Sequence, residues 1–270
     1  MKKVKYGEIT VYEWSIFTAY RDRIITGVTG RSGGVTTGRF SSFNLGLHVG
    51  DNPAHVVANR QLLCEGLGVD FDRFTCARQT HGANVRLVTP ELAGRGRDNL
   101  EDSLPDVDAL VTQERGITIN ICLADCTPLV FYNPSQHIGA VVHAGWQGTA
   151  LLIAQQAMHF LQIKFSCRPA DILVGIGPGI GACCYQVNAD VLNKLYATFP
   201  YAPDIFKLKE QHHLYPNIAE ANYQQLRAVG VPPGNIDVAE LCTYCGSDDF
   251  FSERKLGRPT GRFACFLSLK

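Results

Sequence analysis

The sequence lacks an excess of charge of either sign, because its 25 Lys and Arg residues are balanced by 25 Asp and Glu residues. A domain that binds nucleic acid usually carries a basic excess, so we expect no nucleic-acid partner. The chain also lacks a run approaching the roughly 20 apolar residues that a membrane-spanning helix needs. These absences make a small molecule the expected binding partner.

The sequence also lacks the pattern of a secretion signal. The N-terminus is basic, with Lys2, Lys3 and Lys5, but Glu8 and Glu13 interrupt the segment where the apolar stretch of a signal peptide would lie. We therefore expect a cytoplasmic protein that does not act at a membrane. In that setting, its 10 cysteines do not indicate the disulfide framework of a small secreted domain. Five of them stand among apolar residues and are expected to be buried hydrophobic side chains: Cys64, Cys76, Cys122, Cys167 and Cys265.

Patterns typical of strands and of helices are mixed along the whole chain, without a linker, a repeat or a low-complexity segment. This mixture predicts one α/β or α+β domain over residues 1–270. The segment 125–128 is expected to interrupt an apolar run that begins at residue 117 and resumes at residue 129. The expected helices span residues 54–67, 149–163, 189–198 and 217–229, and the expected strands span residues 74–78, 85–89, 117–123, 129–132, 138–142, 171–176, 236–239 and 262–269.

Three residues that can bind a metal each stand where an apolar segment ends in small, turn-forming residues. His81 precedes a glycine, Cys126 precedes a Thr-Pro pair, and His143 precedes an Ala-Gly pair. Side chains at such strand ends can converge in an open pocket. Two imidazoles and a thiolate suit Zn²⁺, and a site with three protein ligands keeps a fourth position for water, as catalytic zinc sites do.

The spacing of these residues is also consistent with other roles. A lone histidine at a strand end is often structural, and Cys126 could instead be a nucleophile with His143 or His81 as its base. Asp125 stands beside Cys126, where it could orient a ligand, act as a general base or serve as a structural cap. Residue spacing alone leaves these alternatives open.

Five short motifs point to one protein family. They are SFNLGLHVGD at residues 42–51, QTHG at 79–82, ADCTP at 124–128, HAGW at 143–146 and FFS at 250–252. In sequence, order and separation, the chain from roughly residue 24 to residue 269 resembles the YfiH-like laccase-domain proteins. The resemblance implies a multilayer α/β/β/α fold. It also implies one zinc ion bound by the motif residues His81, Cys126 and His143.

The family resemblance further implies an enzyme that acts on purine nucleosides. The expected reactions are the phosphorolysis of adenosine, inosine and methylthioadenosine, with nucleoside and phosphate as substrates, and the deamination of adenosine. In deamination, zinc-bound hydroxide would attack C6 of the purine, with His81, Cys126 and His143 in the catalytic group and Asp125 as a further candidate. The candidates for substrate or anion binding are Asn44, Arg60, Arg78, Arg254 and Arg258.

Two residues depart from the family pattern. Gln147 follows HAGW where arginine is usual, and this removes one cation that could hold phosphate. Glu253 follows FFS where an aromatic residue or histidine is usual. Both departures leave the metal ligands unchanged but alter the expected anion binding and substrate preference.

Three other functions compete with the nucleoside enzyme. A copper polyphenol oxidase, which the family's older name suggests, is disfavoured because the 8 histidines include no His-x-His pair. A blue-copper site would also want an axial methionine, and the two methionines are Met1 and Met158, the latter inside an expected helix. A role in removing wrongly built peptidoglycan precursors and a non-catalytic zinc-binding module are the remaining alternatives.

Two further features are expected to be structural. Cys242 and Cys245 have the Cys-x-x-Cys spacing of half a zinc site or of a redox pair, but the chain has no second pair of this spacing. A reduced structural pair is therefore preferred, while a disulfide and a second metal site stay open. The glycine-rich run 175–181 does not match the dinucleotide-binding pattern, so we expect a tight loop that shapes the pocket.

Overall fold

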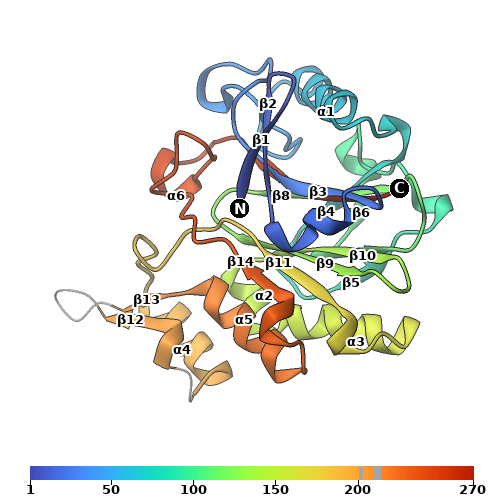
Figure 1. The fold of residues 1–270 in the computed structure, drawn as a ribbon. Helices are drawn as coiled ribbons and strands as arrows, with labels where there is room; N and C mark the ends of the chain where they lie inside the picture. Colours follow the sequence, from blue (N-terminus) through green and yellow to red (C-terminus); the bar gives the residue numbers. More distant parts are fainter. Residues whose placement is uncertain (201–202, 209–213) are drawn as a thin grey trace.

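The computed structural model describes residues 1–200, 203–208 and 214–270. Two β-sheets pack face to face, and helices cover the outer face of each sheet (Figure 1). The layers therefore follow the order α/β/β/α, and the expected mixed α/β fold is confirmed. None of the helices in the described ranges is both long and apolar enough to cross a membrane.

The first sheet has seven strands. Neighbouring strands run antiparallel from its first strand to β8, and parallel from β8 to its last strand. In order across the sheet, the strands are β1 (Lys2–Tyr6), β2 (Ile9–Glu13), β3 (Ile24–Thr29), β15 (Phe263–Leu269), β8 (Thr118–Leu123), β4 (Phe74–Arg78) and β6 (Leu104–Pro105).

The second sheet has six strands and is antiparallel at its centre, with a parallel pair at each edge. In order, these are β14 (Ile236–Val238), β11 (Leu173–Ile176), β9 (Thr127–Asn133), β10 (Ile138–Ala144), β7 (Ala109–Thr112) and β5 (Val85–Leu87). A separate pair of short strands, β12 (Phe206–Leu208) and β13 (Leu214–Pro216), lies beside the helical layer that covers this sheet (Figure 1).

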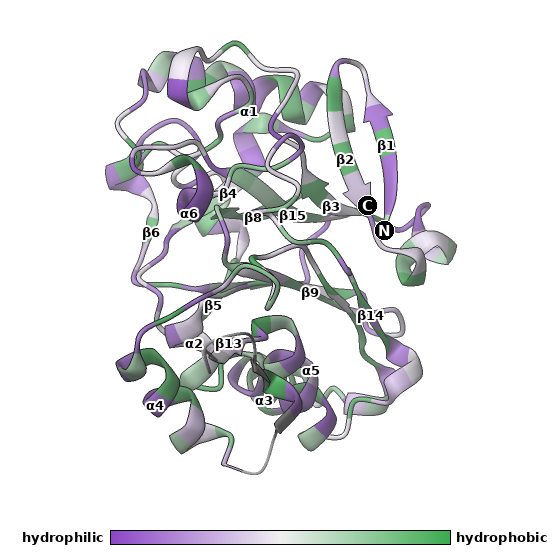
Figure 2. Ribbon diagram, turned by 90° about the vertical axis from the view of Figure 1, so that its left-hand side faces the viewer, coloured by the Kyte–Doolittle hydropathy of each residue, from purple (hydrophilic) through white to green (hydrophobic). Residues whose placement is uncertain are grey.

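Apolar side chains fill the three interfaces between the four layers. One cluster lies between the sheets and joins residues such as Ile121 of β8 to Val141 of β10. A second cluster packs α1 (Pro53–Leu67) on the first sheet, and a third packs α3 (Ile153–Phe165) and α5 (Ile218–Ala228) on the second. Figure 2 shows this distribution, with hydrophobic residues concentrated on the strands of both sheets. The central strands β15, β9 and β10 are therefore buried on both faces.

Most expected elements are confirmed within a few residues. Helix α4 (Ala189–Thr198) has the expected bounds, and Asn52 and Asn217 cap α1 and α5 through their side-chain oxygens. The expected helix 149–163 is wrong in one respect, because it is divided into α2 (Trp146–Ala150) and α3 around Leu152, whose φ is 62°. The side chain of Gln225 supports this break, since it donates to Thr149 O and accepts from Ala154 N.

The strand prediction around residue 125 is also wrong. The segments before and after it are not one interrupted strand: β8 belongs to the first sheet and β9 to the second. The chain crosses between the sheets at residues 124–126, where Asp125 has a φ of 85°. The strands without a counterpart among the expected elements are β1, β2, β3, β6, β7, β12 and β13. The crossover matters for function because it places Cys126 at the junction of the two sheets.

Candidate metal centre and active site

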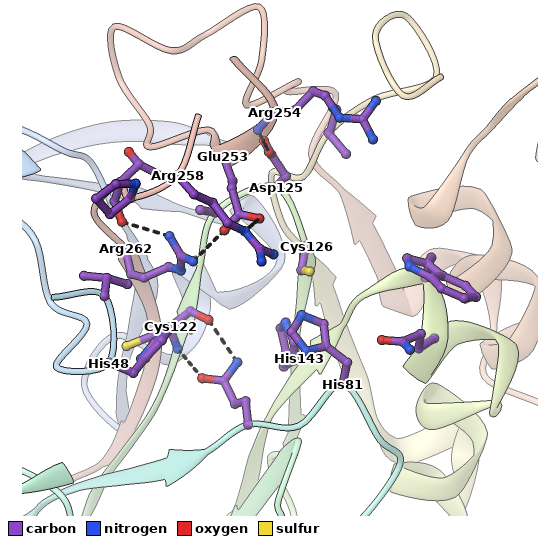
Figure 3. A pocket seen from close by; sticks show the side chains of 18 of the residues that line it. His48, His81, Cys122, Asp125, Cys126, His143, Glu253, Arg254, Arg258 and Arg262 are labelled. Carbon is purple, nitrogen blue, oxygen red and sulfur yellow. Dashed lines mark hydrogen bonds and ion pairs between the residues drawn. The ribbon is translucent and has the colours of Figure 1, made fainter. Parts of the chain in front are cut away.

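The structure brings His81, Cys126 and His143 together from three distant places in the chain (Figure 3). His143 lies near the end of β10, where its backbone pairs with Pro128 of β9, and Cys126 directly precedes β9. His81 follows β4 in a turn and has a φ of 62°. One ligand atom from each of the three residues lies within 4.8 Å of the others, so the group could hold a metal ion.

Gly145 allows these side chains to approach one another. A Cβ atom added at this position would lie 3.0 Å from Cys126 Sγ and 3.1 Å from His81 Cδ2. Real Cβ contacts are rarely so close, and here the neighbours are the candidate ligands themselves. The glycine of the HAGW motif is therefore required by packing around the metal group.

Asp108 organises two of the three candidate ligands, and sequence reasoning missed it. Its buried carboxylate lies 2.7 Å from His143 Nδ1 and accepts a hydrogen bond from His81 N at 3.0 Å. The same carboxylate accepts bonds from Gly82 N at 2.7 Å and from Thr80 N at 3.3 Å. Because Nδ1 of His143 is engaged, its Nε2 is the nitrogen that faces the metal group. A carboxylate behind a ligating histidine is a common arrangement in metal sites, where it fixes the orientation of the ring.

Gln79 fixes the same turn to the end of β8. Its side-chain Nε2 donates to Cys122 O at 2.9 Å, and its Oε1 accepts from Cys122 N at 2.8 Å (Figure 3). This pair of bonds replaces backbone pairing where β4 and β8 have already separated. The QTHG motif is therefore held by its glutamine on one side and by Asp108 on the other.

The three side chains shift one another's protonation. Burial alone would raise the pKa of the Cys126 thiol, but His143 and His81 outweigh it and lower the pKa to about 6. Burial alone would lower the pKa of His143, but Cys126 and Asp108 outweigh it and raise the pKa to about 9. At neutral pH the metal-free group therefore contains a thiolate beside an imidazolium. A bound cation would take the place of the proton on His143.

The metal group borders a pocket of about 1000 Å³. Ligand pockets typically range from about 300 to 1000 Å³, so this one is large enough for a nucleoside together with phosphate. Its wall includes the aromatic side chains of Trp146 and Tyr185. Gln79 and His81 of the QTHG turn also line it. The remaining charged or ionisable lining residues are His48, Arg78, Cys122, Asp125, Cys126, His143, Glu253, Arg254, Arg258 and Arg262.

Asp125 lines this pocket, but its carboxylate oxygens are used in structural bonds. Thr243 Oγ1 donates to one oxygen at 2.6 Å, and Arg254 N donates to the other at 2.7 Å. The second bond fixes the start of α6 (Glu253–Leu256). Of the roles left open for Asp125, these contacts favour the structural one.

Asn44 and Arg60 lie outside the pocket lining, in contrast to their expected roles in substrate binding. Arg60 is buried, and its guanidinium donates to the carbonyl oxygens of Leu45, Gly96 and Arg97 at 2.6–2.9 Å. Asn44 is fully buried, and its Oδ1 accepts from Arg262 N at 2.8 Å. Both residues therefore stabilise loops behind the pocket, and we do not assign them to substrate.

Arg78 and Arg254 do line the pocket. Arg78 approaches Glu101 only to 3.9 Å on the exposed rim, and the Arg254 guanidinium stacks over the Tyr185 ring at 5.3 Å. Gln147 is exposed beside Trp146 at the start of α2. An arginine at position 147 would place a cation beside the same pocket.

Glu253 forms ion pairs with two arginines of the pocket. Its Oε1 lies 2.6 Å from Arg258 Nε, and its Oε2 lies 2.7 Å from Arg262 Nη2 (Figure 3). Arg258 was among the predicted anion-binding residues, whereas Arg262 was not. The departure at Glu253 therefore places an anion inside the part of the pocket that is richest in cations.

Comparison with known proteins identifies the family. The model described as "Multi-copper polyphenol oxidoreductase laccase" matches residues 25–270. The chain belongs to this family. Its relatives include the purine nucleoside phosphorylase YlmD of Geobacillus stearothermophilus, 40% identical over 244 residues that cover 90% of this chain and 89% of the relative. The adenosine deaminase RL5, from an unknown prokaryotic organism, is 34% identical over 228 residues, which cover 83% of this chain and 85% of that protein.

Solved structures in the family have the same fold. The crystal structure of YlmD from G. stearothermophilus has a TM-score of 0.93 at 36% identity and covers 99% of this chain and 98% of that one. The structure of the hypothetical protein YfiH from Bacillus licheniformis has a TM-score of 0.91 at 33% identity and covers 97% of both chains. The resemblance inferred from the five motifs is therefore confirmed.

Proposed function

We propose that this chain is a zinc-dependent enzyme of purine nucleoside metabolism. It cleaves adenosine, inosine and methylthioadenosine with phosphate to give the base and a ribose 1-phosphate or methylthioribose 1-phosphate. It also converts adenosine and water to inosine and ammonia. The main support is that the His81, Cys126 and His143 group opens onto a pocket of about 1000 Å³ that contains both aromatic rings and arginines. The names of relatives at 34–40% identity support the substrate class.

The chemistry of the three side chains fits zinc. Two imidazoles and one thiolate are nitrogen and sulfur donors that suit Zn²⁺, and Asp108 behind His143 Nδ1 supplies the outer hydrogen bond usual in such sites. When bound at such a site, zinc acts as a Lewis acid and lowers the pKa of water to about 7. Copper is less suited, because the candidate metal groups in the described ranges contain only two histidines, His81 and His143.

The side chains of the pocket divide into a base-binding part and an anion-binding part. Trp146 and Tyr185 offer aromatic faces on which a purine can stack, while Gln147 and Gln79 offer amide groups that can hydrogen-bond to it. Among the pocket arginines in the described part of the chain, Arg254 has no ion pair and Arg78 has only the long contact with Glu101 at 3.9 Å. We assign phosphate to these arginines and to the neighbouring pair Arg258 and Arg262, where it must compete with Glu253.

The first prediction is that added positive charge will strengthen phosphate binding. Gln147→Arg adds a cation beside the pocket, and Glu253→Gln removes the carboxylate that pairs with Arg258 and Arg262. Each change is expected to lower the KM for phosphate by up to about tenfold, which corresponds to about 1.4 kcal/mol. Deamination uses no phosphate and should change by less than about twofold.

Steady-state kinetics at several phosphate concentrations measure this effect. Glu65→Gln, at an exposed position on α1, makes the same charge change far from the pocket and should leave the KM for phosphate unchanged. An equal change in phosphorolysis and deamination, or no change in either, would show that these positions do not contact phosphate.

Product analysis tests the proposed function itself. Purified zinc-loaded protein, incubated with adenosine and phosphate, should form adenine and ribose 1-phosphate, and it should form inosine and ammonia when phosphate is omitted. Both reactions should stop with a chelator and return when zinc is restored. Oxidation of a phenol by copper-loaded protein, with no nucleoside products, would identify a polyphenol oxidase instead. Bound zinc without any turnover would identify a binding module.

A further inference from the structure

A second group of metal-binding side chains lies outside the site described above. Cys183 and Cys184 follow the glycine-rich loop after β11, and Cys242 and Cys245 follow β14. Their four Sγ atoms all lie within 4.8 Å of one another. The group has no local mark in the sequence, because the partner of the Cys-x-x-Cys pair is an adjacent pair of cysteines far away in the chain.

The spacing of the sulfur atoms matches a tetrahedral zinc site better than a disulfide. Cys184 Sγ lies 3.4 Å and Cys183 Sγ lies 3.7 Å from Cys245 Sγ. Four thiolates at about 2.3 Å from a zinc ion are separated from one another by roughly 3.8 Å, as tetrahedral geometry requires. A disulfide would need about 2.05 Å, and none of the ten cysteines forms one in the structure.

The surrounding backbone is built around this group. Gly181 N donates to Cys242 Sγ at 3.2 Å, which is the kind of outer hydrogen bond that orients a ligating thiolate. A Cβ atom added at Gly181 would lie 3.2 Å from Cys183 Sγ and 3.3 Å from Cys242 Cβ. Thr243 N also donates to Gly179 O at 3.0 Å, which joins the loop that contains Cys242 to the glycine-rich loop. Two loops are therefore held together at the point where the four sulfur atoms meet.

We propose that Cys183, Cys184, Cys242 and Cys245 form a second zinc site. Four thiolate ligands fill all positions of a tetrahedral ion, which is the mark of a structural rather than a catalytic site. The ion would join the loop after β11 to the loop after β14. No part of this inference depends on nucleoside chemistry.

This second site has a direct structural connection to the pocket. Thr243 lies between two of its ligands, and its hydroxyl donates to Asp125, the neighbour of Cys126. Ile180 and Tyr185, on either side of the Gly181–Cys184 segment, line the pocket. The second zinc would therefore stabilise one wall of the pocket without contacting the substrate.

Metal analysis of the full-length protein tests the proposal. Wild-type protein purified with zinc under reducing conditions should contain two zinc ions per chain. Cys183→Ser combined with Cys245→Ser changes the two exposed ligands and should remove one of them. Cys126→Ala should remove the other, and the triple variant should contain none. Cys167→Ser, at a buried cysteine outside both groups, is the matched control and should keep two.

Zinc X-ray absorption of the wild type gives an answer that needs no variant. With both sites filled, sulfur should dominate the zinc environment, whereas the His81, Cys126 and His143 site alone would show a single sulfur among nitrogen and oxygen ligands. One zinc per wild-type chain with a single sulfur ligand, or disulfides among the four cysteines in peptide mapping of freshly purified protein, would overturn the second site. That result would leave the proposed function intact, and two zinc ions without nucleoside turnover would do the reverse.

Discussion

Replacing Cys126 with alanine is expected to remove the zinc held with His81 and His143 and to abolish nucleoside turnover. The thiolate is the only anionic ligand of this group, and its loss leaves two neutral imidazoles. Loss of an outer hydrogen bond alone typically weakens metal binding by 10–100-fold, so loss of a ligand should weaken it by at least about 1000-fold. Metal analysis should show one zinc fewer per chain than in wild type, while Cys167→Ser should bind as wild type does. Unchanged zinc content in Cys126→Ala would show that this cysteine is not a ligand.

Loss of activity cannot by itself distinguish a zinc ligand from a cysteine nucleophile, but alkylation can. Because the histidines lower the pKa of Cys126 to about 6, metal-free protein should contain the reactive thiolate at neutral pH. Iodoacetamide should therefore modify Cys126 quickly after chelation, and the rate should fall as the pH drops through about 6 rather than through the usual thiol range near 8.5.

Zinc should slow this modification strongly, because the metal shares the charge of the thiolate and blocks its lone pair. Mass spectrometry of the peptide that contains Cys126 measures the extent of modification with and without zinc. A nucleophilic cysteine would react at the same rate in both states, and chelators would spare its activity. Rapid alkylation in zinc-loaded protein would therefore rule out the assigned ligand set.

The candidate ligands could be predicted from the sequence because each belongs to a short local motif. His81, Cys126 and His143 each stand at the end of an apolar segment beside small residues, and the structure places all three at the edge of one pocket. Asp108 has no such mark. It directly precedes β7 and meets His143 only because β7 and β10 are neighbours in the second sheet. The position of this carboxylate beside His143 depends on which strands are neighbours in the sheet, and local residue spacing does not reveal that order.

The role of an arginine is equally hard to predict from local sequence. Arg60 and Arg78 look alike as single charges, but Arg60 points into the loops below α1 and donates to three backbone carbonyl groups. Arg78 ends β4 and lines the pocket. The difference depends on which carbonyl groups lack a partner, and this is decided by loops distant in sequence.

The fold was most predictable where local pattern and capping agree. Helix α1 begins at Pro53 directly after its cap Asn52, and it is followed by Gly68, whose left-handed φ of 67° suits glycine. The strand β1 was missed because its lysines hide the alternation of a strand at the edge of the first sheet. The crossover at Asp125 was missed because two apolar strands in succession look the same whether or not they share a sheet.

The strongest test of the structural interpretation is Asp108→Asn, which keeps the size of the side chain and removes its charge. One carboxylate oxygen accepts from His143 Nδ1 and His81 N, and the other accepts from Gly82 N and Thr80 N. An asparagine must turn its NH₂ group toward one of these pairs of donors, whichever way the amide is flipped. A buried NH₂ group that faces other donors costs about 1–3 kcal/mol. Depending on the flip, this cost destabilises the turn that presents His81 or the orientation of the His143 ring.

We therefore expect Asp108→Asn to weaken zinc binding at this site by 10–100-fold while the fold is retained. Competition with a chelator of known affinity measures the effect, and circular dichroism checks the fold. Asp106→Asn is the matched control: it lies two residues away, its φ of 53° tolerates asparagine, and it contacts Thr80 and Asn84 rather than a ligand. It should bind zinc within about twofold of wild type. If a folded Asp108→Asn protein bound zinc as tightly as this control, the carboxylate would not position the ligands, and the orientation of His143 would have to come from the packing of β10 alone.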